Sequence, residues 1–223
     1  MINESSKQKL HPFFIGDSVH GNVVFNFSSP AIGQLEAFAA GYHEAGKILA
    51  AKMEASRGYP DYEGYPILFL YRHALELYLK ALVYRGAKLL QVRNNQALET
   101  DFLLTNHRLS KFLPSFRAIL ESTGWKWNFE VAGLRSLQDF EALVRGIEEI
   151  DADSYCFRYP VTTKGVAAHR PHLVINVIAF AKKMDAILDL LDGVVTGLEY
   201  ERDLSIEVEY ILRELLKQEI HEP

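Results

Sequence analysis

Residues 66–90 read PILFLYRHALELYLKALVYRGAKLL, and this stretch decides the fold class. Apolar side chains recur along it at spacings of three and four residues, which is the period of an α-helix. They form two neighbouring rows, the first made of Ile67, Leu70, Ala74, Leu77, Ala81 and Tyr84 and the second of Leu68, Tyr71, Leu75, Tyr78 and Leu82. A helix that is apolar around most of its circumference belongs in the middle of a bundle. We therefore expect a central helix over about residues 66–90.

The helical period continues on both sides of this stretch. Further helices are predicted over about residues 30–57, 108–122, 132–150, 170–198 and 205–220. Pro114 is expected to bend or split the helix that contains it, because proline removes a backbone donor. No long alternating segment occurs, so the fold class is all-α.

We expect an up-and-down bundle of four to five core helices, an additional C-terminal amphipathic helix and a short irregular or hairpin N-terminus. The corresponding ranges are 1–29 for the N-terminal extension, 30–200 for the bundle and 201–223 for the tail helix. One face of the tail helix carries Val208, Ile211, Leu212, Leu215 and Leu216. Little of the bundle is left to cover that face, so we expect it to support self-association.

Composition and cysteine count exclude several classes of protein. The 223 residues are 48% hydrophobic and 24% charged, as in ordinary soluble globular proteins. The single cysteine, Cys156, rules out an internal disulfide framework. The first residues have no apolar run behind a basic end, so we expect no signal peptide there. The longest uncharged helical run, 171–181, is too short to span a bilayer. We expect a cytoplasmic protein with no membrane partner.

Basic residues gather in one segment of an acidic chain. The net charge is −5, yet residues 80–117 carry seven basic side chains against two acidic ones. Such a segment could form a patch that contacts phosphate groups. Alternatively, acidic neighbours in the fold balance these charges at the surface. Both interpretations stay open at this point.

The central helix carries four charged or titratable residues on one narrow stripe. Arg72, Glu76 and Lys80 follow one another at intervals of four residues, and His73 lies beside Glu76. An isolated buried charge is costly, so these groups must either face a groove or pair with one another. The stripe therefore predicts either a polar functional site or a structural ladder of salt bridges.

A second group of candidate residues lies in the loop before the expected 170–198 helix. It consists of Arg158, Tyr159, Lys164, His169, Arg170 and His172. Helix N-termini favour anions, and histidine beside a cation suits acid–base chemistry on a phosphodiester. The alternative is that Arg158 and the aromatic residues anchor the loop.

Motifs for metals and cofactors are absent from the sequence. The run His43-Glu44-Ala45-Gly46-Lys47 lacks the second histidine of the zinc-protease pattern. His169 and His172 lie three residues apart, with no carboxylate or thiolate near enough in sequence to complete a site. No phosphate-binding glycine loop, dinucleotide fingerprint or nucleophile elbow occurs. We expect neither a metal nor a cofactor.

Three segments in order resemble the HEPN superfamily of helical-bundle domains. YRHALELYLKALV at 71–83 resembles the first core helix of the family, NHRLSKFL at 106–113 its Gly-His-x-Leu-x-x-Leu helix start, and FRYP at 157–160 the Arg-Tyr-Pro before its final core helix. The resemblance covers roughly residues 64–200. It implies a bundle of four to five helices that is usually dimeric.

The resemblance also implies a class of function. Many family members are metal-independent ribonucleases in toxin–antitoxin or phage-defence systems, while others bind nucleotides or act as non-catalytic partners. The ribonuclease branch has an arginine followed, after four to six residues, by a histidine on the last core helix. No arginine and histidine in this chain have that spacing: Arg158 and His169 are too far apart, and Arg170 and His172 too close.

The leading hypothesis is a HEPN-type homodimeric module that binds RNA or nucleotide, with or without catalysis, in a bacterial defence or toxin–antitoxin-like setting, with a protein partner encoded nearby. The first alternative is an atypical metal-independent endoribonuclease. Its catalytic residues would be His73, His169 and Glu76, and its ligand-binding residues Arg72, Lys80, Arg158, Tyr159, Arg170 and His172. The second alternative is a non-catalytic structural or interaction partner whose tail helix docks on another chain.

Overall fold

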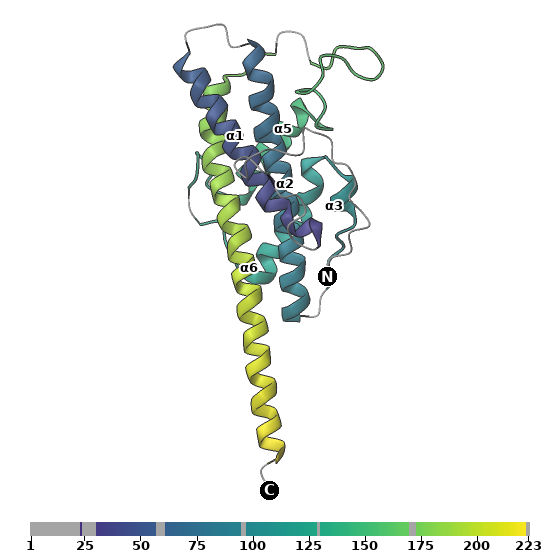
Figure 1. The fold of residues 1–223 in the computed structure, drawn as a ribbon, viewed down its shortest axis with the longest axis vertical. Coiled ribbons are helices and arrows are strands. Elements are labelled where there is room, and N and C mark those ends of the chain that lie inside the picture. Colours follow the sequence, from purple (N-terminus) through teal and green to yellow (C-terminus); the bar gives the residue numbers. More distant parts are fainter. Residues whose placement is uncertain are drawn as a thin grey trace, which may run out of the picture.

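One long helix, α2 (Asp61–Asn94), runs through the middle of the molecule (Figure 1). The structure is a computed structural model, and it describes residues 23, 30–56, 61–94, 97–128, 130–169 and 173–221. The other helices are η3 (Ala31–Gln34), α1 (Leu35–Ala55), α3 (Phe102–Thr105), η4 (Leu109–Phe112), α4 (Leu113–Thr123), α5 (Leu137–Ile150) and α6 (Val177–His221). The predicted N-terminal hairpin lies outside the described residues, apart from Val23. The predicted all-α bundle is confirmed.

The central position predicted for residues 66–90 is also confirmed, because α2 packs against α1, α4 and α6. Its fully buried apolar side chains include Tyr71, Leu75, Leu79, Leu82, Leu89 and Leu90. The predicted start at residue 66 is wrong. The helix begins at Asp61 and carries Pro66 inside it. Asp61 and Glu63 lie in its first turn, where negative charge complements the helix dipole.

The helices α1, α2 and α6 form one side of the bundle (Figure 1). On α2 and α6, Tyr71 donates to Asp185 at 2.7 Å and Tyr78 to Asp192 at 3.1 Å. The two bonds share one sequence offset, so these helices run in the same direction. The helix α1 runs opposite to both. After α2, residues 97–108 lead the chain back, so α4 runs in the same direction as α2 and α5 returns against it.

The predicted break between the 170–198 helix and the tail helix is wrong, because α6 is one helix of 45 residues. No proline interrupts it, and the cost of its two glycines, about 1 kcal/mol each, is too small to end a packed helix. A Cβ at Gly197 would lie 2.9 Å from the Trp125 ring, so glycine there admits the indole. The helix begins at Val177 rather than near residue 170. Asn176 caps this start, because its side-chain oxygen accepts a hydrogen bond from the Ala179 amide.

Two shorter helices complete the bundle. Pro114 was predicted to bend or split its helix; the 3₁₀ helix η4 changes directly into the α-helix α4 at Leu113, and the proline occupies the first turn of α4. The predicted start of α5 at residue 132 is wrong. Residues 131–134 form a turn closed by a bridge between Val131 and Leu134, and the helix starts after Ser136. Ser136 and Asp139 form a capping box that fixes this start.

No helix among the residues described is long and apolar enough to cross a membrane.

The helices α2 and α4 approach each other closely at Gly86 of α2, where the side chain of Ile119 from α4 lies over the backbone. A Cβ added at Gly86 would lie 2.6 Å from Cγ1 and 2.8 Å from Cγ2 of Ile119. Ile119 is itself fully buried, so it has little room to move. Glycine at this position therefore sets the distance between α2 and α4.

We expect Gly86→Ala to lower the free energy of unfolding by about 1–2 kcal/mol, because overpacking outweighs the better helix propensity of alanine. Gly146→Ala in α5 is the matched control. A Cβ there meets open space, so this variant should gain roughly 0.5–1 kcal/mol. Urea denaturation followed by circular dichroism measures both. Equal stability of the two variants would contradict the tight approach at Gly86.

Candidate functional site

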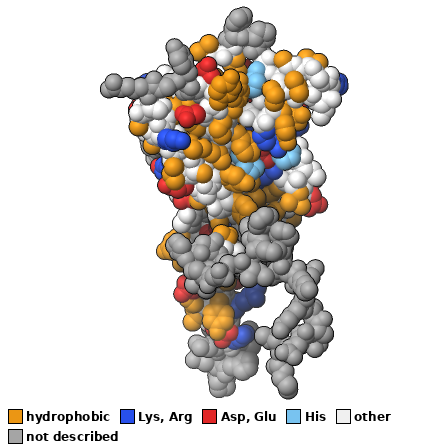
Figure 2. All heavy atoms as spheres, turned by 45° about the horizontal axis from the view of Figure 1, so that its top comes forward, with side chains coloured by type: hydrophobic (Ala, Val, Ile, Leu, Met, Phe, Trp, Pro, Cys, Tyr) orange, Lys and Arg blue, Asp and Glu red, His pale blue; other side chains and the backbone are white. Residues whose placement is uncertain are grey.

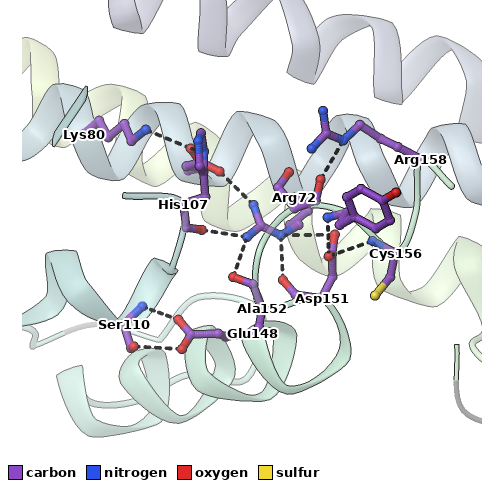
Figure 3. A network of polar contacts seen from close by, with 12 residues as sticks. Arg72, Lys80, His107, Ser110, Glu148, Asp151, Ala152, Cys156 and Arg158 are labelled. Carbon is purple, nitrogen blue, oxygen red and sulfur yellow. Dashed lines mark hydrogen bonds and ion pairs between the residues drawn. The ribbon is translucent and has the colours of Figure 1, made fainter. Parts of the chain in front are cut away.

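A network of buried charges joins α2 to the 106–110 and 151–156 segments (Figure 3). The guanidinium of Arg72 is fully buried. It donates to Oε2 of Glu76 at 2.8 Å, to the carbonyl of His107 at 2.8 Å and to the carbonyl of Asp151 at 3.0 Å. One arginine therefore connects three separate parts of the chain.

Glu76 is the second centre of this network. Its Oε1 atom lies 2.8 Å from Nζ of Lys80 and 2.9 Å from Nδ1 of the His107 ring. Burial of the carboxyl raises its pKa, but the hydrogen bond and charge of Lys80, with hydrogen bonds from His107 and Arg72, outweigh burial and hold the pKa below its usual value. Two cations, Arg72 and Lys80, balance two buried carboxylates, Glu76 and Asp151. These groups neutralise one another inside the protein.

The network also fixes the loop that follows α5. Oδ1 of Asp151 accepts hydrogen bonds from the amides of Tyr155 at 2.6 Å and Cys156 at 3.0 Å. Ser154 has a left-handed backbone with φ of 57°, and its carbonyl accepts from Nε of Arg158 at 2.6 Å. The contacts run from Arg72 through Asp151 to the loop backbone (Figure 3). They determine where Arg158 is held.

Arg158 lies at the surface among aromatic rings. Its guanidinium carbon is 5.7 Å from the ring centroid of Phe69 on α2 and 5.7 Å from that of Tyr159. The ring of His73 stacks on Phe69, with centroids 5.4 Å apart and an interplanar angle of 9°, and meets the edge of Tyr42 at 4.6 Å. We call these five residues the aromatic–cation surface. Figure 2 shows one face of the molecule on which histidine and cationic side chains border apolar ones.

The electrostatic setting of His73 favours the neutral ring. Burial lowers its pKa; Glu76 opposes this effect, while the charges of Arg72, Lys80 and Arg158 lower the pKa further. Within the described part of the chain, the ring nitrogens of His73 have no hydrogen-bond partner. Half-buried and neutral at physiological pH, His73 can therefore donate or accept a hydrogen bond at the surface.

His169 lies in a separate cavity of about 510 Å³ near the start of α2. Its ring packs against Tyr65 at 5.3 Å and Phe157 at 6.0 Å between centroids. Its Nε2 atom is buried and has no hydrogen-bond partner in the described structure. Arg170 and His172, predicted as ligand-binding residues, lie outside the described residues.

Most of the predicted site residues that the structure describes thus fall into two groups, one in the buried network and one at the surface. Arg72, Glu76 and Lys80 lie together in the buried network, while His73 meets Arg158 and Tyr159 through Phe69. The charged stripe on α2 is a ladder of salt bridges along most of its length. Only His73, at its edge, reaches the aromatic–cation surface.

The basic segment at 80–117 is largely balanced by acidic neighbours. Five of its seven cations pair with carboxylates: Lys80 with Glu76, Arg85 with Glu36, Arg93 with Glu201, Arg108 with Asp153 and Arg117 with Glu141. Of the two interpretations of this segment, the balanced surface is the one observed. By contrast, Arg158 has no ion-pair partner among the described residues.

Metal-binding geometry is not found in the part of the chain that the structure describes, where no cluster of three or more His, Cys, Asp or Glu residues could hold a metal ion.

Sequence reasoning missed three residues that shape this site: His107, Asp151 and Phe69. Phe69 lies four residues before His73, so helical spacing alone places the two on one face. His107 belongs to the motif at 106–113. That motif predicted the start of a helix, but it gave no indication that His107 contacts Glu76. Asp151 carried no signal, because its role depends on contacts across 79 residues of sequence.

Comparison of the chain with protein-family models, curated proteins and solved structures found no match.

Glu76→Gln should destabilise the fold by about 3–5 kcal/mol at pH 7, because it leaves two buried cations, Arg72 and Lys80, with a single buried carboxylate, Asp151. The folded-state pKa of Glu76 is depressed, so its contribution is present above the unfolded pKa of about 4.3 and is lost as pH falls through the folded value. Wild type should therefore lose more stability than the variant below about pH 4. Urea denaturation across pH 3–7 measures this difference.

Glu130→Gln is the control, because it removes an exposed carboxylate paired with Arg135 and should change stability by less than about 0.5 kcal/mol. A Glu76→Gln protein as stable as this control would show that the buried network is dispensable.

Proposed function

We propose that this chain is a HEPN-type dimeric module that binds RNA or nucleotide through the aromatic–cation surface. We place it in the bacterial cytoplasm, in a defence or toxin–antitoxin-like setting, with a protein partner encoded nearby. The observation that carries the binding proposal is Arg158, an unpaired guanidinium held over the rings of Phe69 and Tyr159 next to the neutral ring of His73. Each of these groups suits one part of a nucleotide.

The chemistry of the surface supports this ligand class. Arginine recognises phosphate through paired N–H donors, and its planar face stacks on bases. Nε of Arg158 is engaged by Ser154, which leaves the terminal nitrogens for a phosphate. Tyr159 is 49% exposed, so a base can stack on its ring. His73 can supply a hydrogen bond to a base edge or a 2′-hydroxyl.

The family proposal is supported by where the three HEPN-like segments lie. Arg72 of the 71–83 segment donates to the carbonyl of His107, which belongs to the 106–113 segment. Arg158 of the 157–160 segment lies over Phe69, one turn before His73. Three segments far apart in sequence therefore meet around one buried network and one surface.

Binding of a fluorescein-labelled single-stranded RNA should weaken about 5- to 150-fold in Arg158→Ala, which removes a stacking and phosphate contact of roughly 1–3 kcal/mol. Arg158→Lys keeps the charge without the planar fork and should fall between this variant and wild type. Fluorescence anisotropy over a salt series measures the affinities, with mononucleotides as competitors.

The matched control is Arg135→Ala, because Arg135 is also an exposed arginine but lies near the start of α5 and pairs with Glu130. It should bind RNA as wild type does. Equal affinity of the Arg158→Ala and Arg135→Ala proteins would contradict this surface as the binding site. Absence of salt-dependent binding of RNA and of mononucleotides by wild type would contradict the function itself.

An atypical metal-independent ribonuclease is the second candidate function, and the state of His73 favours it. A neutral imidazole beside a cation can take the proton from a 2′-hydroxyl as that oxygen bonds to phosphorus, while the arginine stabilises charge on the phosphate. The P–O5′ bond breaks in the same step, and the leaving 5′-oxygen takes a proton from water. His169, in its separate cavity, has no described contact with Arg158. We therefore assign the base to His73 and not to His169.

If the chain cleaves RNA, His73→Ala should lower the rate in EDTA by about 100-fold or more, and His169→Ala should leave it within a few-fold of wild type. A general base must be deprotonated, so the wild-type rate should fall as pH drops through a pKa below about 6.5. A gel assay of a labelled RNA gives the rates. Equal rates in all three proteins would remove the ribonuclease candidate.

A further inference from the structure

The C-terminal part of α6 projects beyond the bundle (Figure 1). Near its start, Arg93 of α2 binds Glu201 and Ser205. Among the described residues, no side-chain hydrogen bond or ion pair joins residues 206–217 to the rest of the bundle. We call residues 204–217 the arm. Its exposed large apolar side chains are Leu204, Ile206, Val208, Tyr210, Ile211, Leu212, Leu215 and Leu216.

Most of these side chains share one face of the arm. At about 100° per residue, six of the eight fall within an arc of roughly 140°. This arm stripe consists of Leu204, Val208, Ile211, Leu212, Leu215 and Leu216. Ile206 and Tyr210 lie on the opposite side. A stripe of this width is typical of a helix packed against a partner.

The arm stripe does not point toward its own bundle. Further up α6, the buried face is formed by Ala181, Met184, Ile187, Leu188, Leu191, Val195 and Leu198. On the same helical projection, the centre of that face and the centre of the arm stripe are about 120° apart. A partner helix packed on the arm stripe would therefore lie on a different side of α6 from the chain's own bundle. The stripe is suited to a second chain.

We propose that the arms of two copies of this chain pair in parallel, stripe against stripe. The charges beside the stripe favour this arrangement. One flank carries three carboxylates and one cation: Asp203, Glu207, Glu214 and Lys217, which binds Glu214. The other carries two cations and one carboxylate: Arg202, which binds Asp203 across the helix, Arg213, and Glu209, which binds Arg213. Parallel pairing brings the acidic flank of each arm to the more basic flank of the other, whereas antiparallel pairing brings like flanks together.

This inference deepens the dimer in the proposed function and rests on that part of it. It assigns the contact between the two copies to the arm. It does not depend on RNA binding, because the arm and the aromatic–cation surface share no residue.

Two matched substitutions test whether the arm is the interface. Val208 is 47% exposed and lies in the stripe, while Ile206 is 49% exposed and lies on the opposite side. We expect Val208→Glu to halve the mass measured by light scattering after size exclusion, and Ile206→Glu to keep the dimer mass. Circular dichroism checks that both remain folded, since neither position is in the core.

The outcomes separate the two proposals. A monomeric wild-type protein would overturn both the dimer and the arm pairing. A dimer that persists in Val208→Glu would leave the dimer standing and overturn the arm pairing.

Cysteine cross-linking tests the parallel direction. In a Cys156→Ser background, Leu204→Cys and Leu215→Cys should each form a disulfide-linked dimer under mild oxidation, because parallel arms place each position beside its own copy. Ile206→Cys, outside the stripe, should not. The two stripe positions are about 16 Å apart along the helix, so antiparallel arms could link at most one of them to its own copy. Dimer bands from only one, or from neither, would overturn parallel pairing.

Discussion

The ion pair between Arg72 and Glu76 is the constraint on which the rest of the structure depends. Both side chains lie inside the protein, where a lone charge would be costly to desolvate. The cost is offset because each of the three guanidinium nitrogens donates to a carboxylate or a carbonyl. Lys80 and Asp151 complete the charge balance. A buried polar centre of this kind does more to fix the positions of the segments that it joins than to stabilise the fold.

The buried network also determines where residues at the surface lie. The carbonyls that Arg72 holds belong to the segment before η4 and to the loop after α5, so neither can shift without breaking a buried hydrogen bond. Asp151 holds the loop backbone in turn, and Arg158 is fixed by the carbonyl of Ser154. A surface arginine is thereby held in place over Phe69, which reduces the conformational entropy lost when a ligand binds.

The sequence allowed the all-α class and the central helix to be predicted because the helical period of residues 66–90 is set by local spacing alone. Helix ends were less accessible. The start of α5 depends on the Ser136 capping box, and α6 continues through Gly193 and Gly197, whose small cost in helix propensity does not end a packed helix. The charged stripe predicted buried partners but not their identity, since Asp151 and His107 reach Arg72 only after folding.

The uninterrupted course of α6 has a mechanical consequence. With 45 residues it is a rod roughly 68 Å long, whose upper half is wedged in the core. A rotation or tilt of its free end would displace Asp185 and Asp192, which accept hydrogen bonds from Tyr71 and Tyr78 of α2. The same helix, α2, carries Phe69 and His73. These two hydrogen bonds therefore provide a direct mechanical connection between the projecting end of α6 and the helix that carries Phe69 and His73.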